Sequence, residues 1–374
     1  MKVRIWLSVL LFTLPVVFYR AQQVVRIEND SRNISAQFEA IRNNAKAGSR
    51  FWIGYKIIRN DGRKLQIGTY IIDDDKNLFT LRNMIDGSQK FKNYALSSKK
   101  KNHFGRSVRI ENSFAIGDKK VDNETAILFL YDLGSKSKYD FSEVTISNLS
   151  CFVDLEGDQL FWLGEKDNKN SSDFLFELYN NTNDISLKKE IVPSISIHND
   201  QLKVTQFLIN IINGKTDNEL MQDAVFWLGF QNNNEAFTAL KKLVESNSTL
   251  EIKKNAVMSL SMIELPESID ELIYIAKHYN ESDMRKQAIY GLGSKAIKKA
   301  EDALKYIVEN DPDIEIKKHA VYTLANSSHE IIPYLIKIAR TNPNISIRKS
   351  AIWSLGNMDD EKATDTLISM VKGK

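Results

Sequence analysis

One short string of residues returns at a nearly constant interval through the second half of this 374-residue chain. It reads Ala-Val-Phe-Trp-Leu-Gly at 224–229, Ala-Ile-Tyr-Gly-Leu-Gly at 288–293 and Ala-Ile-Trp-Ser-Leu-Gly at 351–356. Seven copies, of which the one at 191–196 is degenerate, begin at residues 159, 191, 224, 256, 288, 320 and 351. The intervals are therefore 32, 33, 32, 32, 32 and 31 residues, which is the signature of stacked structural repeats.

Each interval predicts two helices. The first, second and fifth residues of the string are apolar in nearly every copy, and a helix places these positions on one face. The sixth residue is Gly, Ser or Ala, which either lets a neighbouring helix approach or lets the helix end. A second apolar pattern with helical spacing follows, as at Ile332, Leu335, Ile336 and Ala339. Because one helix pair cannot bury its apolar face alone, we expect an all-α, right-handed solenoid of about seven two-helix repeats over residues 151–374.

The residues around the string resemble the short bacterial HEAT repeats, which are related to those of phycobilisome lyases. The matching features are a turn, an Ile-Lys-Lys or Ile-Arg-Lys step, and an Ala-hydrophobic-x-x-Leu-Gly string. They are most complete at Ile316–Ala325, and the resemblance covers roughly residues 154–374. It implies the solenoid fold, but solenoids of this type serve many unrelated tasks.

Residues 23–150 lack the repeat and favour a different domain. A short helix is expected over Ser35–Ala47, followed by strands. The segments rich in β-branched and aromatic residues are Arg50–Ile58, Leu65–Asp73, Arg106–Asn112, Thr125–Tyr131 and Phe141–Ile146. The sequence Asn60-Asp61-Gly62 predicts a hairpin between the first two strands. We expect a small antiparallel β domain of the sandwich type, and it resembles no family that we can name.

The first 22 residues have the pattern of an export signal. Lys2 and Arg4 precede an apolar run, Ile5–Phe18, and Arg20 ends that run before the ~20 residues that a membrane-spanning helix needs. We expect cleavage near Ala21, and the alternative is an uncleaved anchor, which would be the chain's one link to a membrane. The mature protein is then expected to be periplasmic or extracellular, free or attached to the cell envelope.

Motifs for catalysis or metal binding are scarce. Cys151 is the only cysteine, which excludes intramolecular disulfides and cysteine-based zinc clusters. Asp73–Asn77 has oxygen ligands at alternate positions, but Leu78 stands where a calcium loop needs glycine. Deoxyhypusine hydroxylase, an enzyme of HEAT architecture, uses four His-Glu pairs to hold two irons, whereas this sequence has one such pair, His329-Glu330. We therefore expect no metal, no cofactor and no enzymatic activity.

Charged residues form two columns before the strings. The first column is Lys188, Lys253, Arg285, Lys317 and Arg348, and the second is Lys189, Lys254, Lys286, Lys318 and Lys349. Acidic residues three positions earlier, at Glu251, Asp283 and Glu315, can pair with the second column. The columns are either a charge ladder that joins adjacent repeats or a basic ridge for an acidic partner. A net charge of +3, from 51 basic and 48 acidic residues, argues against a nucleic-acid partner.

An aromatic column occupies the third position of the string. Its members are Phe161, Phe226, Met258, Tyr290, Tyr322 and Trp353. This position lies away from the apolar face of the helix, so the column either packs between stacked repeats or lines an exposed surface that holds a partner.

Together these features predict a non-enzymatic, exported scaffold that binds a protein partner through its solenoid. The candidate partner-binding residues are Tyr290, Tyr322, Trp353, Lys254, Lys286, Lys318 and Lys349. One alternative is an enzyme whose active site lies in the β domain, near Asp73–Asp75 and His103, and whose repeats recruit substrate. Others are an oxidoreductase or lyase of HEAT type and an envelope-assembly protein with a permanent partner.

Overall fold

The computed structural model describes residues 24–27, 30–60, 65–68, 71–72, 78–87, 108–110, 122–134, 141–214, 216–295, 297–327 and 329–372. The predicted export signal, Asp73–Asp75, and His103 lie outside these residues. The chain divides into two compact units, and the division in the later part of the chain falls between Lys166 and Asp167. Within the described ranges, no helix is both long enough and apolar enough to cross a membrane.

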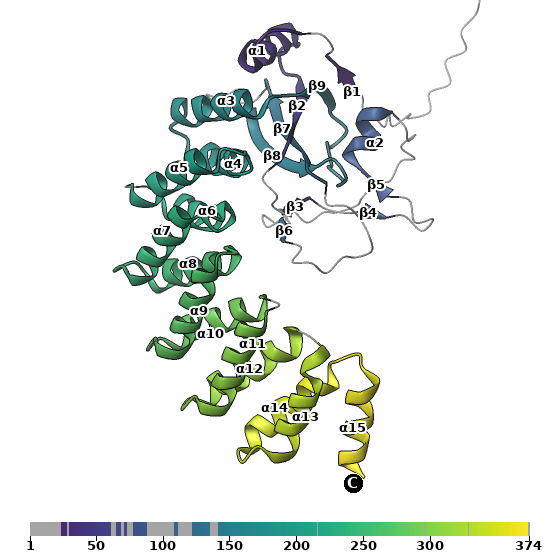
Figure 1. The fold of residues 1–374 in the computed structure, drawn as a ribbon. Helices are drawn as coiled ribbons and strands as arrows, with labels where there is room; N and C mark the ends of the chain where they lie inside the picture. The colour runs from purple at the N-terminus through teal and green to yellow at the C-terminus, as the bar shows by residue number, and fades with distance from the viewer. Residues whose placement is uncertain are drawn as a thin grey trace, which may run out of the picture. The chain divides into compact units, whose positions relative to one another are not determined.

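The first unit is built on a mixed sheet of five strands in the order β1-β9-β2-β7-β8 (Figure 1). These strands are β1 (Val24–Arg26), β9 (Gln159–Glu165), β2 (Arg50–Ile58), β7 (Glu124–Asp132) and β8 (Phe141–Asn148). Strands β1 and β2 both pair with β9 in parallel, whereas β7 and β8 are antiparallel. Two further sheets have two strands each: β3 (Leu65–Ile67) with β6 (Val108–Ile110), and β4 (Ile71–Ile72) with β5 (Leu78–Phe79).

The predicted β domain is confirmed, but three details of it are wrong. The main sheet is mixed rather than antiparallel, because strand β9, from the far end of the unit, inserts between β1 and β2. The described strands form one main sheet and two small ones, not a sandwich. Strand β2 lies between β9 and β7, and β3 pairs with β6, so the predicted pairing of these two strands with each other does not occur; Asp61 and Gly62 of the predicted turn lie outside the described residues.

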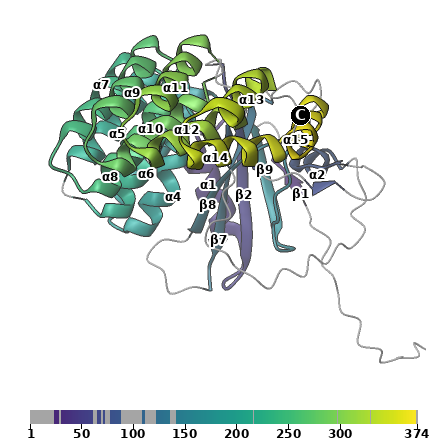
Figure 2. The ribbon, with the colours of Figure 1, turned by 90° about the horizontal axis from the view of Figure 1, so that it is seen from below.

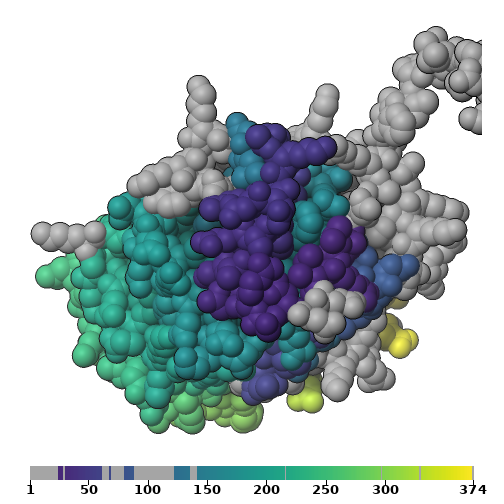
Figure 3. Space-filling model, turned by 90° about the horizontal axis from the view of Figure 1, so that it is seen from above, coloured from purple at the N-terminus to yellow at the C-terminus, as the bar shows by residue number. Residues whose placement is uncertain are grey.

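Helices cover both faces of the main sheet. On one face Phe38 of α1 (Ile34–Asn44) packs edge-on against Phe129, with the ring centroids 5.0 Å apart. On the other face Leu81 of α2 (Leu81–Asp86) joins Trp52 and Leu160 in a buried apolar cluster. Because successive residues of a strand point to opposite faces, two covered faces explain why β2 is an almost continuous apolar run. The outer side of α1 forms part of the molecular surface (purple in Figure 3).

The string at Gln159–Gly164, predicted to be the first repeat helix, is strand β9. Glu156 and Gly157 just before it have positive φ angles of 53° and 78°, so the chain turns sharply there. Leu160 and Trp162 then point to the same face of the sheet, where both are buried. The predicted solenoid boundary at residue 151 is therefore too early, since β9 completes the first unit.

The second unit is a stack of thirteen described α-helices (Figure 1). They are α3 (Asn168–Asn181), α4 (Ile185–Ser196), α5 (Gln201–Asn213), α6 (Asn218–Leu228), α7 (Asn234–Glu245), α8 (Leu250–Met262), α9 (Pro266–His278), α10 (Ser282–Gly293), α11 (Lys298–Asn310), α12 (Ile314–Ser327), α13 (Ile332–Thr341), α14 (Ile345–Gly356) and α15 (Glu361–Val371). The remaining six strings fall on the even-numbered helices α4 to α14. These helices make six pairs preceded by α3, in agreement with the predicted number of about seven repeats. Figure 2 shows the even-numbered helices in one row and the odd-numbered helices from α5 to α13 in a second row.

The string packs as its pattern predicts. Ala288, Ile289 and Leu292 of α10 are completely buried. The last repeat differs, because Ile352 of α14, which is equivalent to Ile289, is 40% exposed. No described helix pair follows α14 and α15 to cover it.

The small residue at the sixth position of the string permits close contact between helices. A Cβ atom added to Gly229 would lie 2.7 Å from the carbonyl oxygen of Ser259 on α8. One added to Gly293 would overlap the side chain of Thr323 on α12. The even-numbered helices therefore touch almost backbone to backbone at these points.

Candidate functional site

The first basic column is structural. Nε of Arg285 donates to the carbonyl oxygen of Ala276 at 2.8 Å, and its guanidinium also pairs with Asp311. Nζ of Lys317 donates to the carbonyl oxygen of Glu309 at 2.9 Å. These acceptors lie at the C-terminal ends of the odd-numbered helices, where carbonyl groups lack partners within the helix and the helix dipole favours positive charge. Arg285 and Lys317 therefore each join their repeat to the one before it.

The second basic column behaves differently. Lys189 of α4 pairs with Glu219 of α6, and Lys318 pairs with Glu315 at 2.9 Å, as the spacing of these last two predicts. Lys254, Lys286 and Lys349 form no ion pair with any described residue. Lys349 is exposed, and the other two are half-buried. Three of the five lysines of this column therefore have an ammonium group that no described carboxylate neutralises.

The aromatic column continues the same stripe of each helix. Met258, Tyr290, Tyr322 and Trp353 each follow a lysine of the second column by four residues, so both side chains share one helix face. Their exposed fractions are 39%, 59%, 46% and 58%, respectively. The rings of Tyr322 and Trp353 lie 5.7 Å apart on neighbouring helices. In these four repeats the column is thus a surface, whereas Phe226 is half-buried and Phe161 belongs to β9.

We call this surface the Lys–aromatic face. It consists of Lys254, Met258, Lys286, Tyr290, Lys318, Tyr322, Lys349 and Trp353 on α8, α10, α12 and α14. All seven candidate binding residues predicted from the sequence lie on it, together with Met258.

Several lysines on the odd-numbered helices, in contrast, have partners in a neighbouring repeat. Lys241 of α7 pairs with Glu271 of α9 at 2.6 Å. The ammonium group of Lys277 lies 4.0 Å from the ring centre of Tyr306 on α11, in a cation–π contact. Lysine side chains therefore link neighbouring repeats on the odd-numbered row and, through Lys189, at the start of the even-numbered row, whereas Lys254, Lys286 and Lys349 of the even-numbered row have no described ion pair.

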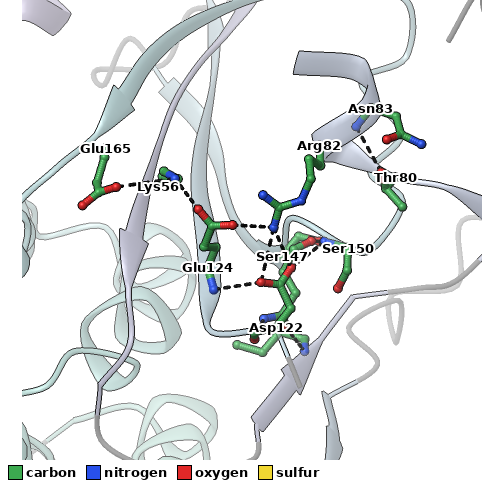
Figure 4. Close-up of polar contacts among 11 residues, drawn as sticks. Lys56, Thr80, Arg82, Asn83, Asp122, Glu124, Ser147, Ser150 and Glu165 are labelled. Carbon is green, nitrogen blue, oxygen red and sulfur yellow. Dashed lines mark hydrogen bonds and ion pairs between the residues drawn. The ribbon is translucent and has the colours of Figure 1, made fainter. Parts of the chain in front are cut away.

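The first unit holds a second cluster of charged side chains (Figure 4). Glu124 accepts hydrogen bonds from Lys56 and from Arg82, the latter at 2.5 Å, and Arg82 also pairs with Asp122 at 3.3 Å. Lys56 lies 3.4 Å from Glu165 as well. Lys56 and Arg82 line a cavity of about 250 Å³ with apolar walls that include Trp162 and Leu149. Sequence analysis missed this cluster, because its members come from distant segments and form no motif.

The pKa of Glu124 reflects these contacts. Burial acts to raise the pKa of this carboxyl, but hydrogen bonds and charges from Lys56 and Arg82 outweigh burial and lower the pKa below its ordinary value of 4.5. A carboxyl with a lowered pKa in the folded state stabilises the fold above its unfolded-state pKa. This contribution is lost as the pH falls through the lower, folded-state pKa.

Replacing Glu124 by glutamine is expected to lower the free energy of unfolding at neutral pH by about 1–3 kcal/mol, because Lys56 and Arg82, both half-buried, each lose one of their two charged partners. The variant should also lose part of the acid sensitivity of the wild type below pH 4.5. Urea denaturation at neutral pH and at about pH 3.5 measures both effects. Glu165→Gln is the control, since that carboxylate is 53% exposed and its removal should change little. Equal acid sensitivity of wild type and Glu124→Gln would contradict the assignment.

Other residues with catalytic potential are buried or scattered. His198 and Ser171 form a hydrogen bond of 2.8 Å between Nε2 and Oγ, but both residues are completely buried, so neither can meet a substrate. The only free cysteine, Cys151, is buried too. Among the described residues, no three His, Cys, Asp or Glu side chains gather in a way that could hold a metal ion.

Comparison with known proteins identifies the second unit. Residues 205–293 and 301–374 match the family model described as HEAT repeats, so the predicted HEAT-like solenoid is confirmed. No curated protein matches the chain. A chain of the complex of CpcE and CpcF of phycocyanin lyase from a Nostoc species is 18% identical with a TM-score of 0.31, and the match covers 41% of this chain and 98% of that one. Human deoxyhypusine hydroxylase is 16% identical with a TM-score of 0.31, over 44% of this chain and 66% of that one.

These two structures correct one prediction. Both bear the names of enzymes, which overturns the prediction that this chain has no enzymatic activity. The scarcity of catalytic motifs was a weak basis for it, because an active site can be assembled from residues that are distant in sequence. At these identities and TM-scores the likeness assigns no reaction to this chain.

Proposed function

We propose that this chain is an exported scaffold that holds a protein partner on the Lys–aromatic face of its HEAT solenoid. The observation that carries the proposal is the coincidence, on four successive repeats, of exposed Met, Tyr or Trp side chains with lysines that mostly lack an ion pair. Aromatic side chains combine a large apolar area with polar atoms, and a few of them often supply most of the binding energy of an interface.

The arrangement of the repeats supports the proposal. A solenoid places equivalent residues of successive repeats side by side and so creates an extended binding surface. Buried string residues such as Ile289 and basic residues such as Arg285 already join the repeats. The aromatic side chains nevertheless stay 46% to 59% exposed, even where the rings of Tyr322 and Trp353 lie 5.7 Å apart. Export rests on the basic residues Lys2 and Arg4 and on the apolar run that follows them. N-terminal sequencing of the protein recovered from a periplasmic fraction tests that part.

Replacing Tyr290, Tyr322 and Trp353 together by alanine is expected to leave the helical content unchanged and to weaken partner capture about tenfold or more. The measurement is affinity capture from an envelope extract, followed by titration of the captured protein against each variant. Tyr274→Ala/Tyr306→Ala is the matched control, because these side chains are 54% and 53% exposed but lie on α9 and α11 of the other row. If the control loses the partner and the triple variant keeps it, the binding face is wrongly assigned.

A further inference from the structure

We propose that the Lys–aromatic face binds an extended acidic peptide segment of its partner, which crosses the even-numbered helices in turn and presents a carboxylate at about every third residue. This inference rests on the proposed function and specifies the chemistry that the face recognises. Three features lead to it: the order of side chains along each helix, the distance between neighbouring helices, and the charges that lack a partner.

The side chains form columns that run from helix to helix. Along each helix an acid or serine is followed three residues later by a lysine and seven residues later by the aromatic residue or methionine. The stripes are Glu251-Lys254-Met258, Asp283-Lys286-Tyr290, Glu315-Lys318-Tyr322 and Ser346-Lys349-Trp353. Spacings of three, four and seven keep each stripe on one helix face. A ligand that lies across the helices therefore meets one lysine and one large side chain per repeat.

The step between repeats sets the spacing in the ligand. Packed helices have axes roughly 8–10 Å apart, and an extended chain advances roughly 3.3 Å per residue, so about three ligand residues span one repeat. The close contacts of Gly229 with Ser259 and of Gly291 with Ser261 keep this step short. Carboxylates at every third position would then meet Lys254, Lys286, Lys318 and Lys349 in turn. The intervening residues would lie against the aromatic column.

The charges favour a peptide over a nucleic acid. Lys254, Lys286 and Lys349 have no carboxylate partner among the described residues. The carboxylates of an acidic ligand would supply these partners. A phosphodiester backbone would also meet the exposed acids of the same stripes, Glu251 and Asp283, and would be repelled by them. A peptide places its negative charge at discrete points, and each can lie over the lysine column.

The test uses the full mature chain and fluorescein-labelled peptides of about 13 residues, a length that reaches four repeats at three residues per step. One peptide carries glutamate at every third position among Gly, Ser and Leu. A second has the same composition with the glutamates contiguous, and oligothymidylate serves as the nucleic-acid probe. Fluorescence anisotropy should show that the periodic peptide binds at least tenfold more tightly than either other probe, with an affinity that falls as salt rises. Equal affinity for the two peptides, no binding of either, or tighter binding of the oligonucleotide would each overturn the inference.

Two lysine variants locate the binding. Lys254→Gln/Lys286→Gln/Lys349→Gln should weaken binding of the periodic peptide at least tenfold. The control, Lys242→Gln/Lys337→Gln/Lys362→Gln, removes the same charge from exposed lysines of α7, α13 and α15 and should change the affinity less than twofold. Equal losses in both variants would mean that net charge, not this face, governs binding.

The inference and the proposed function fail in different ways. If the three aromatic residues are needed for partner capture while the peptides are not distinguished by spacing, the scaffold function stands and the acidic-segment model is wrong. If capture does not depend on those residues, the proposed function itself is wrong.

Discussion

Replacing Arg285 by alanine is expected to lower the free energy of unfolding of the solenoid by about 3–5 kcal/mol. The side chains of Arg285 and Asp311 are only 11% and 5% exposed. The substitution leaves the Asp311 carboxylate buried without its cation and leaves the carbonyl oxygen of Ala276 without its donor. The loss of one partner of a buried ion pair is far more costly than the net contribution of the pair, because the remaining charge stays desolvated.

Urea denaturation followed by far-ultraviolet circular dichroism measures this loss. Lys317→Ala is the matched control, since Lys317 occupies the equivalent position of the next repeat but its bond to the carbonyl oxygen of Glu309 is exposed. The control should lose less than about 1 kcal/mol. A second variant, Arg285→Met with Asp311→Leu, replaces both charges and should recover most of the stability. If Arg285→Ala were as stable as the control, the buried pair would have no role in joining the repeats.

Ile289→Ala is expected to cost about 2–5 kcal/mol, whereas Ile352→Ala should cost less than about 1 kcal/mol. The two residues hold the same position in the string, and their side chains are chemically identical. Ile289 is completely buried between neighbouring repeats, so its truncation leaves a cavity that packed helices cannot fill. Ile352 is 40% exposed, so water already contacts much of it and replaces the missing atoms without a cavity.

The same urea titrations distinguish these variants, and hydrogen–deuterium exchange locates the effect. Faster exchange should be confined to α10 and its neighbours in Ile289→Ala, because each repeat contacts only adjacent repeats. Two variants of equal stability would show that burial in the stack does not determine the cost at this position.

The sequence predicts the solenoid well because one repeat constrains the next. An interval of about 32 residues, repeated six times, leaves few other ways to bury Ala288, Ile289 and Leu292. The helix predicted for the first copy of the string is wrong for a physical reason. Gln159–Gly164 contains apolar residues at positions that suit both a helix and a strand, and its pairing with β1 and β2 depends on segments more than 100 residues earlier. Local periodicity carries no information about such distant partners.

The sequence predicted which residues form the candidate binding face, but not whether their side chains are exposed to solvent. The spacing placed Tyr290 and Trp353 away from the buried helix face, yet it left open whether adjacent repeats cover them. Their exposure of 59% and 58% decides the question, because it depends on how closely the helices stack. The Glu124 cluster could not be predicted from the sequence. Lys56, Arg82 and Glu124 are far apart in the chain, and β2, α2 and β7 bring them together.

The two rows of helices differ in how tightly they pack, and this difference affects how the array can bend. Gly229 against Ser259 and Gly293 against Thr323 leave no side-chain volume to compress, so this row resists shortening. The odd-numbered row is joined partly by long lysine side chains, such as Lys241 with Glu271, whose many rotamers absorb displacement. We therefore expect bending of the array to change the spacing of the odd-numbered row more than the spacing of lysines and aromatic groups along the even-numbered row. The binding residues on the even-numbered row would then keep their spacing for a ligand even when the array bends.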